Sequence, residues 1–366
     1  MKIEVLQENL SKALSLTSRF VSTRAQLPVL SNVLLSAKGT KLHLSATNLE
    51  ISLSTAIGAK VEEEGEITIP AKVFTDLISN LSKGPLTLIS EKEQLTIKSS
   101  HFDGNILGLN PSEFPVVPSK LGSTNAIQTN DFIKALSQTT FSSSSDVTRP
   151  ILTGVLFTTD DKTSALQLVG TDGFRLSRKI INLKEPLSFG KVIVPKTALL
   201  ELSRIFNDEE KLGFEVDQEN KQVLFGNGDT ILSSRLIEGD FPPFEKIIPT
   251  EAIIEVKLSK DELLRATKVA SVIARDNGYV GKINIKPDAL EISAESSSSG
   301  NQKVVVEAKV EGGEMEILFN LRFLEEFLNV VDGEEISISL INSDSPGVFR
   351  DTSTTDLLHL IMPVKV

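Results

Sequence analysis

The feature that most constrains this chain is a strand-to-helix segment that occurs three times at constant spacing. The copies are Ile67–Ile78, Val192–Leu202 and Glu316–Phe327. In each copy a short apolar run leads into an amphipathic helical pattern. The junctions fall at Pro70, Pro195 and Asn320, which are 125 residues apart each time. Proline suits a first helical turn and asparagine suits an N-cap, so the pattern predicts the same local structure three times.

Other features keep the same order and nearly the same period. Each copy opens with a short strand and a helix, within residues 3–14, 126–136 and 254–266. Hairpin turns are expected at Lys38–Thr40, Asp160–Lys162 and Lys286–Asp288. A matching tetrapeptide follows, ending at Asn48, Asp172 and Ser296. Copies one and two both end on an acidic residue followed by Phe-Pro, and the serine runs Ser142–Ser145 and Ser296–Ser299 are interpreted as surface loops.

These repeats predict three tandem α+β domains, each with two helices and several antiparallel strands, at residues 1–121, 122–250 and 251–366. Sheets with open edges are hazards that proteins cover or close. Domains repeated head to tail can join their sheets edge to edge, and the array then closes into a ring or runs on as a filament. A triplicated fold without special assembly remains the alternative.

Little in the chain suggests catalysis. It has no cysteine, which excludes disulfides, thiolate metal ligands and a cysteine nucleophile. The three histidines, His43, His101 and His359, are far apart and are expected to have surface or core roles. Metalloprotease and P-loop patterns are absent, and Gly226–Gly228 is interpreted as a hairpin turn. We expect no catalytic residue, no metal and no cofactor. A hydrolase built from repeated α+β domains, with a site that the sequence hides, remains the other function class.

The charge and the termini bear on location and partners. The formal net charge of −11 argues against nucleic acid unless cations gather on one face. The first residues lack the apolar core of a signal peptide, and no apolar run approaches the roughly 18 residues of a membrane span. We therefore expect a cytoplasmic protein that does not enter a membrane.

The whole chain resembles the sliding-clamp family of bacterial DNA polymerase III β subunits. The three copies carry the resemblance, together with Thr171–Leu176, Gly239–Phe244 and Leu360–Val366. It implies three copies of the clamp fold in a ring-shaped, head-to-tail homodimer with helices around a central hole. Such a ring encircles double-stranded DNA without regard to sequence and confers processivity. The implied partners are the DNA polymerase III catalytic subunit, the clamp loader and other proteins with a clamp-binding motif.

The predicted helices carry cations that such a hole would need: Lys12, Arg19, Lys72, Lys83, Lys134, Lys196, Arg204, Lys260, Arg265, Lys268, Arg275 and Arg322. Acids such as Glu201 lie on the same helices, and ordinary solvated charge is the alternative interpretation. Dilute charge fits sliding, because tight phosphate contacts fix register on a duplex. By resemblance, Arg24, Arg149 and Lys196 contact DNA.

The resemblance also implies a hydrophobic cleft between domains two and three that receives short peptide segments with a glutamine and one or two large apolar residues. Its lining is expected to be Leu152, Thr171, Gly173, Arg175, Leu176, Pro242, Lys246, Ile247, Tyr279, Asn320, Phe323, Pro346, Met362, Pro363 and Val364. An apolar floor with a few polar anchors suits peptide binding, although buried core is the alternative for several of them. Phe174 and the ending Val364–Val366 depart from the family pattern. Leu107, Val272 and Ile273 are the implied dimer contacts.

Overall fold

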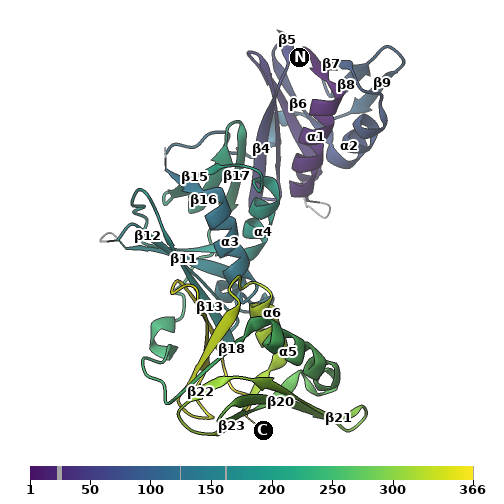
Figure 1. Cartoon of the computed structure of the whole chain (residues 1–366). Helices are drawn as coiled ribbons and strands as arrows, with labels where there is room; N and C mark the ends of the chain where they lie inside the picture. Colours follow the sequence, from purple (N-terminus) through teal and green to yellow (C-terminus); the bar gives the residue numbers. More distant parts are fainter. Residues whose placement is uncertain (23–26, 124, 161–162, 366) are drawn as a thin grey trace. The chain divides into compact units, whose positions relative to one another are not determined.

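The computed structural model describes residues 1–22, 27–123, 125–160 and 163–365. Within them the helices come two to each repeat, as the sequence pattern predicts (Figure 1). They are α1 (Gln7–Thr17), α2 (Ala71–Asn80), α3 (Thr129–Thr140), α4 (Lys196–Ile205), α5 (Lys260–Ala274) and α6 (Leu321–Leu328). None of these helices is long and apolar enough to cross a membrane.

The strands of the described residues form four antiparallel sheets. The first has the order β5 (Lys60–Glu63), β1 (Lys2–Leu6), β7 (Pro85–Glu91), β8 (Gln94–Lys98), β9 (Asp103–Leu107). The second is β10 (Ala126–Gln128), β15 (Lys211–Asp217), β16 (Gln222–Asn227), β17 (Thr230–Arg235), β4 (Ile51–Gly58), β3 (Lys41–Thr47), β2 (Asn32–Lys38), β6 (Gly65–Pro70). The third is β14 (Lys191–Pro195), β11 (Gly154–Asp160), β12 (Ala165–Thr171), β13 (Arg175–Asn182), β26 (Leu357–Ile361), β25 (Gly347–Asp351), β24 (Glu335–Leu340), β18 (Ile254–Ser259), β22 (Lys309–Glu311). The fourth is β21 (Gly300–Glu307), β20 (Ala289–Ser296), β19 (Val280–Lys286), β23 (Met315–Asn320).

Each repeat contributes two four-stranded halves to these sheets. The halves of one kind are β1-β7-β8-β9, β10-β15-β16-β17 and β18-β24-β25-β26. Those of the other kind are β4-β3-β2-β6, β13-β12-β11-β14 and β21-β20-β19-β23. Within the chain, β17 of repeat two pairs with β4 of repeat one, and β26 of repeat three pairs with β13 of repeat two. The three tandem α+β copies are therefore confirmed, and their sheets run from one copy into the next.

The compact units of the chain do not follow the repeats. One unit comprises Met1–Asn130 with Leu200–Leu236, and the other comprises Asp131–Leu199 with Ile237–Val366. The division passes through repeat two because its two sheet halves pair with different neighbours, at the β17–β4 and β13–β26 joints. The boundaries near residues 121 and 250 stay a prediction about the repeats.

The strand-to-helix junctions differ in detail from the expectation. Asn320 acts as the predicted N-cap, with its side chain accepting a hydrogen bond from the backbone N–H of Arg322 at 3.0 Å. Pro70 and Pro195 are each the last residue of a strand, one residue before the helix begins, and not in the first helical turn. Proline fits there because its fixed φ suits extended backbone as well as a helix start.

The tetrapeptides matched in the sequence form the same turn in all three repeats. Asn48 Oδ1 accepts the N–H groups of the second and third residues after it, at 3.0 and 2.8 Å. Asp172 Oδ1 does the same at 2.9 and 3.0 Å, and Ser296 Oγ at 3.2 Å in both bonds. Such side chains mimic backbone turns. Asn48, Asp172 and Ser296 therefore occupy equivalent positions in the three repeats.

The expectation of two surface serine loops was half right. Ser297–Ser299 are exposed, but Ser142, Ser143 and Ser144 are buried. Ser143 Oγ donates to the carbonyl of Gly154 at 2.9 Å. Short hydroxyls can be buried where such partners exist, which composition does not reveal.

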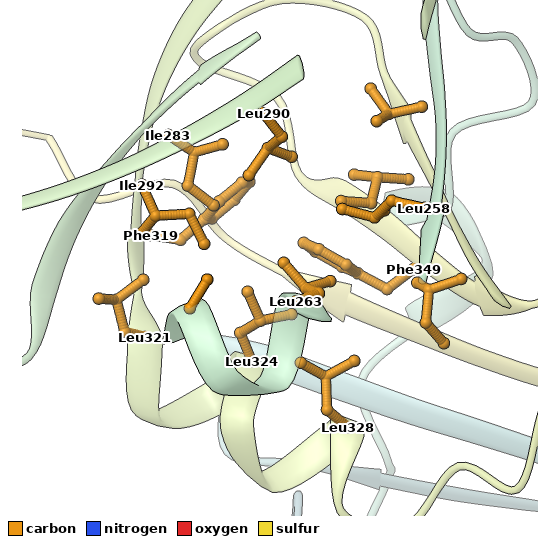
Figure 2. Packing of buried hydrophobic residues seen from close by; sticks show 14 of the residues in the cluster. Leu258, Leu263, Ile283, Leu290, Ile292, Phe319, Leu321, Leu324, Leu328 and Phe349 are labelled. Carbon is orange, nitrogen blue, oxygen red and sulfur yellow. The ribbon is translucent and has the colours of Figure 1, made fainter. Parts of the chain in front are cut away.

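The third repeat has its own apolar core, shown in Figure 2. Helices α5 and α6 pack on each other and close this core from one side (Figure 1). Leu263 and Leu324 are fully buried from the helices, and Phe319 and Phe349 meet edge to face from two strands, with ring centroids 5.7 Å apart. This dense packing gives the adjoining surface a rigid base.

Candidate partner-binding surface and sheet edges

The joint between β13 and β26 has an apolar floor. Leu176 pairs in register with Leu360, and both belong to a buried cluster that Phe244 completes. Phe244 begins the 3-10 turn η5 (Phe244–Ile247), from which Lys246 and Ile247 are exposed. Apolar and cationic side chains thus stand together beside the sheet joint.

Arg175 is held from every side. Its Nε lies 3.0 Å from Asp172, Nη1 lies 2.5 Å from Glu326, and Nη2 donates to the carbonyl of Phe141 at 2.9 Å. The guanidinium carbon stands 4.3 Å from the centroid of the Phe323 ring. Burial alone would raise the pKa of Glu326, but the hydrogen bond and charge of Arg175 outweigh it and the pKa is lowered. Arg175 therefore ties β13 to α6 as a charged pair.

The C-terminal segment is fixed by backbone bonds. The N–H of Met362 donates to the carbonyl of Phe174, and that of Val364 donates to the carbonyl of Leu318, both at 2.8 Å. Met362, Pro363 and Val364 are partly exposed, and Phe174 is 60% exposed. An end with apolar side chains is thus held in place with part of its surface open to a partner.

Tyr279 and Asn320 lie together at the start of α6. The carbonyl of Tyr279 accepts the N–H of Leu321 at 2.8 Å, and Asn320 pairs with Val280. Tyr279 has a φ of 62°, which is a left-handed backbone conformation. This conformation is uncommon for a bulky residue, and the residues that adopt it are often found at functional sites. The side chain of Tyr279 is only partly buried.

Thr171, Gly173 and Leu152 surround the turn before β13. Thr171 Oγ1 donates to the carbonyl of Arg175 at 2.6 Å and accepts the N–H of Gly173 at 3.1 Å. A Cβ added at Gly173 would lie 3.4 Å from Nη1 of Arg149. Leu152 is buried, and its carbonyl accepts the N–H of Ser144 at 2.8 Å. The turn is thereby fixed with an arginine at its side.

The structure brings most of the expected lining residues together. Sheet pairing and hydrogen bonds unite Thr171, Gly173, Arg175, Leu176 and Met362, to which the Arg175–Phe323 contact joins α6. Leu152 and Pro242 are placed through their neighbours, since Ile151 and Phe241 pack against the apolar cluster. Pro346 precedes Gly347, which pairs with Ile361, so it lies where the tail leaves the sheet.

Several residues that support this surface were missed by the sequence analysis. Glu326 and Phe141 anchor Arg175 from 151 and 34 residues away, so no local pattern signals them. His359 is fully buried beneath the surface, with Nδ1 2.7 Å from Ser177 Oγ, which in turn lies 2.8 Å from Ser142 Oγ. Burial holds the pKa of His359 well below its usual value, so the imidazole is neutral there.

The three cations expected to contact DNA have different settings. Arg24 lies outside the described residues. Arg149 is exposed, with Nε 3.2 Å from Asp146, and its side chain stands beside Gly173. Lys196 is half-buried and donates to the carbonyl of Ser143 at 3.3 Å; burial, and then the charge of Arg175, lower its pKa. Arg149 and Lys196 thus lie near the Arg175 turn, and their DNA contacts stay a prediction.

The helical cations are mostly exposed, but several are paired with acids. Arg19 makes a two-pronged pair with Glu201, with bonds of 3.0 and 2.9 Å. Arg204 reaches the same carboxylate at 2.8 Å. Lys12, Lys72, Arg265 and Lys268 are exposed without an ion pair among the described residues. The expected dilution of positive charge by neighbouring acids is therefore present.

Strands β9 and β21 each lie at the edge of a sheet. Among the described residues, β9 pairs only with β8, and β21 pairs only with β20. Leu107 on β9 is 73% exposed. Helix α5 packs on β21 and carries Val272, which is 66% exposed, and Ile273, which is partly buried. These are apolar side chains beside unpaired backbone groups, the features of a strand edge that pairs with another chain.

The described residues contain no group of three or more histidines, cysteines or carboxylates placed to hold a metal ion.

Comparison with known proteins assigns the whole chain. The model of the DNA polymerase III beta subunit N-terminal domain matches residues 1–118, that of the central domain 126–243, and that of the C-terminal domain 245–365. A curated relative from Staphylococcus aureus, named beta sliding clamp, is 29% identical over 378 aligned positions that cover 100% of this chain and 99% of the relative.

Solved structures agree with this assignment. The DNA polymerase sliding clamp from Bacillus subtilis matches with a TM-score of 0.94 at 27% identity, covering 100% of this chain and 99% of that one. The DNA polymerase III subunit beta from Pseudomonas aeruginosa matches with a TM-score of 0.93 at 26% identity, and both chains are fully covered. With matching family models along nearly all of its length, the chain belongs to the DNA polymerase III beta subunit family.

Proposed function

We propose that two copies of this chain join head to tail through β9 and β21 into a closed ring around duplex DNA, and that partner proteins bind at the β13–β26 joint. As a member of its family the chain is a sliding clamp, a processivity factor for DNA replication without a catalytic site of its own. One observation supports the proposed head-to-tail joint. The strand pair that joins repeat two to one, and repeat three to two, has a third counterpart in β9 and β21, and among the described residues each of these two strands has one edge without a partner.

The two joints within the chain predict the register of the third. Leu107 corresponds to Arg235, since each stands two residues before a residue that bridges to another strand, Leu109 to Thr68 and Ile237 to Ile193. The N–H of Arg235 donates to the carbonyl of Glu50, two residues after Asn48. The N–H of Met362 likewise donates to the carbonyl of Phe174, two residues after Asp172.

By the same rule, the N–H of Leu107 should donate to the carbonyl of Ser298 of the partner subunit, two residues after the turn at Ser296. Ile106 should then stand opposite Ser299 of the partner subunit, as Ser234 stands opposite Ile51 and Ile361 opposite Arg175. In this arrangement Leu107, Val272 and Ile273 supply apolar contact at the joint. A C2 dimer contains this joint twice and leaves no open edge of this kind.

Association with DNA is proposed to be weak, independent of sequence and topological. The net charge of −11 and the pairing of Arg19 and Arg204 with Glu201 dilute the positive charge of the helices, so we expect few tight phosphate contacts. Counterion release makes affinity from such contacts fall with salt, whereas a ring closed around circular DNA should resist moderate salt because topology holds it there. Arg24, Arg149 and Lys196 are proposed DNA contacts, and the cytoplasm is the proposed location.

The surface around Leu176, Leu360 and Met362 is proposed to receive short segments of the DNA polymerase III catalytic subunit, the clamp loader and other clamp-motif proteins. The floor is apolar, the tail residues are held by backbone bonds, and Lys246 and Arg149 are exposed at the side. Preorganised apolar anchors with few polar groups favour peptide binding. No feature of the described residues favours an enzymatic function.

Retention on DNA tests this function. The chain is loaded onto nicked circular DNA with a bacterial clamp loader, and the protein that co-elutes with DNA is measured at moderate salt. A clamp stays bound to the circle and is released when a restriction enzyme linearises it. Equal release from circular and linear DNA would contradict the proposal.

A further inference from the structure

The turn between β20 and β21 lies at the proposed joint between two chains. Ser296 pairs with Gly300, which leaves Ser297–Ser299 as a three-residue hairpin loop. Gly300 has a φ of 92°, and a left-handed residue after a three-residue loop commonly closes a hairpin. The loop is exposed. Its conformation sets the position of the Ser298 carbonyl, the group proposed above to accept the N–H of Leu107 of the partner subunit.

This turn is held differently from the equivalent turns in repeats one and two. There, the side-chain oxygens of Asn48 and Asp172 each accept two backbone N–H groups, at distances between 2.8 and 3.0 Å. Ser296 Oγ accepts its two N–H groups at 3.2 Å. A serine hydroxyl carries a hydrogen of its own and rotates to suit its partners. Both of its lone pairs therefore face the two N–H groups only when another acceptor takes that hydrogen.

Asp276 supplies such an acceptor from outside the turn. It belongs to the 3-10 turn η6 (Arg275–Asn277), which continues α5. Its Oδ2 lies 3.0 Å from Ser296 Oγ, 2.9 Å from Ser298 Oγ and 2.5 Å from Ser299 Oγ. An ionised carboxylate only accepts hydrogen bonds, so the hydroxyls donate to it. The bonds from Ser299, Ser298 and Ser296 hold the pKa of Asp276 below its usual value, and the carboxylate is ionised at neutral pH.

The carboxylate joins two parts of the proposed interface. Helix α5 packs on β21 and carries Val272 and Ile273 (Figure 1). Asp276 follows Val272 by four residues, and its serine partners form the turn that leads into β21. Asp276 thus fixes the turn of the edge strand to the helix that supplies the apolar contact.

We propose that Asp276 is a positioning residue of the joint between chains, which holds the Ser298 carbonyl in place for the N–H of Leu107 of the partner subunit. This inference rests on the proposed head-to-tail joint, and the partner is a second copy of this chain. Ordering a loop before association reduces the entropy that is lost on binding. Asp276 and the serines lie outside the apolar core of repeat three, so changing them should alter the dimer and leave that core intact.

The dimer dissociation constant of the full chain, measured by sedimentation velocity over a concentration series, tests this role. Asp276→Ala should raise it about tenfold, in the range expected when a loop must be ordered on binding. Asp276→Asn keeps an oxygen that can accept from the serines and should raise it at most about threefold. The matched control is Asp261→Ala, at an exposed aspartate in the first turn of α5, and it should have no effect. Thermal unfolding shows that each variant keeps its fold.

A double-mutant cycle tests whether the carboxylate acts through the serines. Ser298→Ala combined with Ser299→Ala removes two donors and should weaken the dimer about as much as Asp276→Ala does. The variant with all three changes should be no weaker, because both sets of changes break the same contacts. Fully additive effects would overturn the proposal, since Asp276 would then act on the dimer independently of the turn.

Leu107→Glu separates this inference from the joint on which it rests. If Leu107→Glu dissociates the dimer while folded Asp276→Ala associates as tightly as the native chain, the positioning role is wrong and the joint stands. If both variants associate as tightly as the native chain, the joint itself is misplaced and the inference fails with it.

Discussion

Strands β13 and β26 form a joint between two repeats within the chain. Strands β9 and β21 are the equivalent pair of strands at the two remaining repeat ends, and they are not paired with each other in one chain. At the closed joint the backbones are paired, Leu176 and Leu360 are buried, and Arg175 adds a charged pair with Glu326. At the open edges the corresponding backbone is unpaired, and Leu107 and Val272 are exposed. The proposed joint between two chains would give β9 and β21 the strand partner that each lacks within one chain.

The two joints also differ in what strengthens them. The closed joint has a buried arginine with three hydrogen-bonding partners and a buried histidine bonded to Ser177. The open edges offer mainly backbone and apolar contacts, with polar residues such as Asn105 and Gln302 beside them. A ring must open to admit circular DNA, so we expect the proposed joint between two chains to be weaker than the β13–β26 joint.

The largest effect is expected at the closed joint from Arg175→Ala. It leaves Glu326 half-buried with a weaker set of partners and removes the contact with the Phe323 ring. Breaking a buried pair in this way costs about 3–5 kcal/mol. Amide hydrogen exchange at Leu176 and Leu360 measures the opening free energy of the joint. The control is Arg322→Ala, which removes an exposed partner of the same Glu326 and should cost at most about 1 kcal/mol. Equal effects of both variants would mean that Arg175 does not stabilise the β13–β26 joint.

At the open edge, Leu107→Glu should separate the dimer. A charge at the centre of the proposed apolar contact is expected to raise the dimer dissociation constant by about a hundredfold or more, the range of an interface hot spot. Sedimentation velocity over a concentration series measures it. Val116→Glu is the matched control, since Val116 is 99% exposed in a loop of the same compact unit. A dimer as tight as the native one in Leu107→Glu would place the interface elsewhere.

Changes in the C-terminal tail should weaken partner binding without affecting ring assembly. Met362→Ala should weaken binding of a peptide with glutamine, leucine and phenylalanine by about ten- to hundredfold, because truncating an apolar anchor costs on the order of 1–3 kcal/mol. Lys365→Ala, which changes an exposed tail residue, should have no effect. Deleting the chain from Met362 onward should abolish peptide binding and leave the dimer intact. Unchanged peptide affinity in the deletion, measured by isothermal titration, would mean that the surface is misplaced.

The smallest effect concerns acid stability of the closed joint. The pKa of His359 is held well below 6.5 in the folded chain, because the side chain is buried. Below pH 6.5 the unfolded chain binds a proton that the folded chain does not, so the free energy of unfolding falls as the pH falls, by at most about 1.4 kcal/mol per pH unit. His359→Gln should remove this part of the slope between pH 6.5 and 5. His101→Gln, at an exposed position, should keep it. The same slope in native protein and His359→Gln would refute the assignment.

Periodicity was enough to predict much of the fold. The spacing of Pro70, Pro195 and Asn320 led to three copies with two helices each, and the matched tetrapeptides that end at Asn48, Asp172 and Ser296 form the same turn in each copy. Local residue patterns work here because caps, turns and alternating strands depend on neighbours in the sequence. Resemblance to the family supplied the list of lining residues, and the residues alone would not have done so.

The rest depends on contacts between distant residues. No pattern near Arg175 announces Glu326, and the serines at 142–144 look like a polar loop although strands and helix α3 bury them. Lys196, for which the resemblance implies a DNA contact, is half-buried and donates to the carbonyl of Ser143, which its local sequence does not reveal. Whether a short polar side chain is buried depends on which distant segments pack against it. The local periodicity of a single sequence does not reveal those contacts.

The head-to-tail joint is tested most directly by a disulfide placed in the predicted register. The chain has no native cysteine, so Ile106→Cys with Ser299→Cys introduces the only two thiols. Residues opposite each other at a site without mutual hydrogen bonds have Cα atoms about 4.5 Å apart, within reach of a disulfide. We expect rapid oxidation to a covalent dimer that survives denaturing electrophoresis. Ile106→Cys with Asn301→Cys, two residues out of register, should stay mostly monomeric under the same conditions. Efficient cross-linking of the shifted pair and not of the predicted pair, or of neither, would contradict the joint.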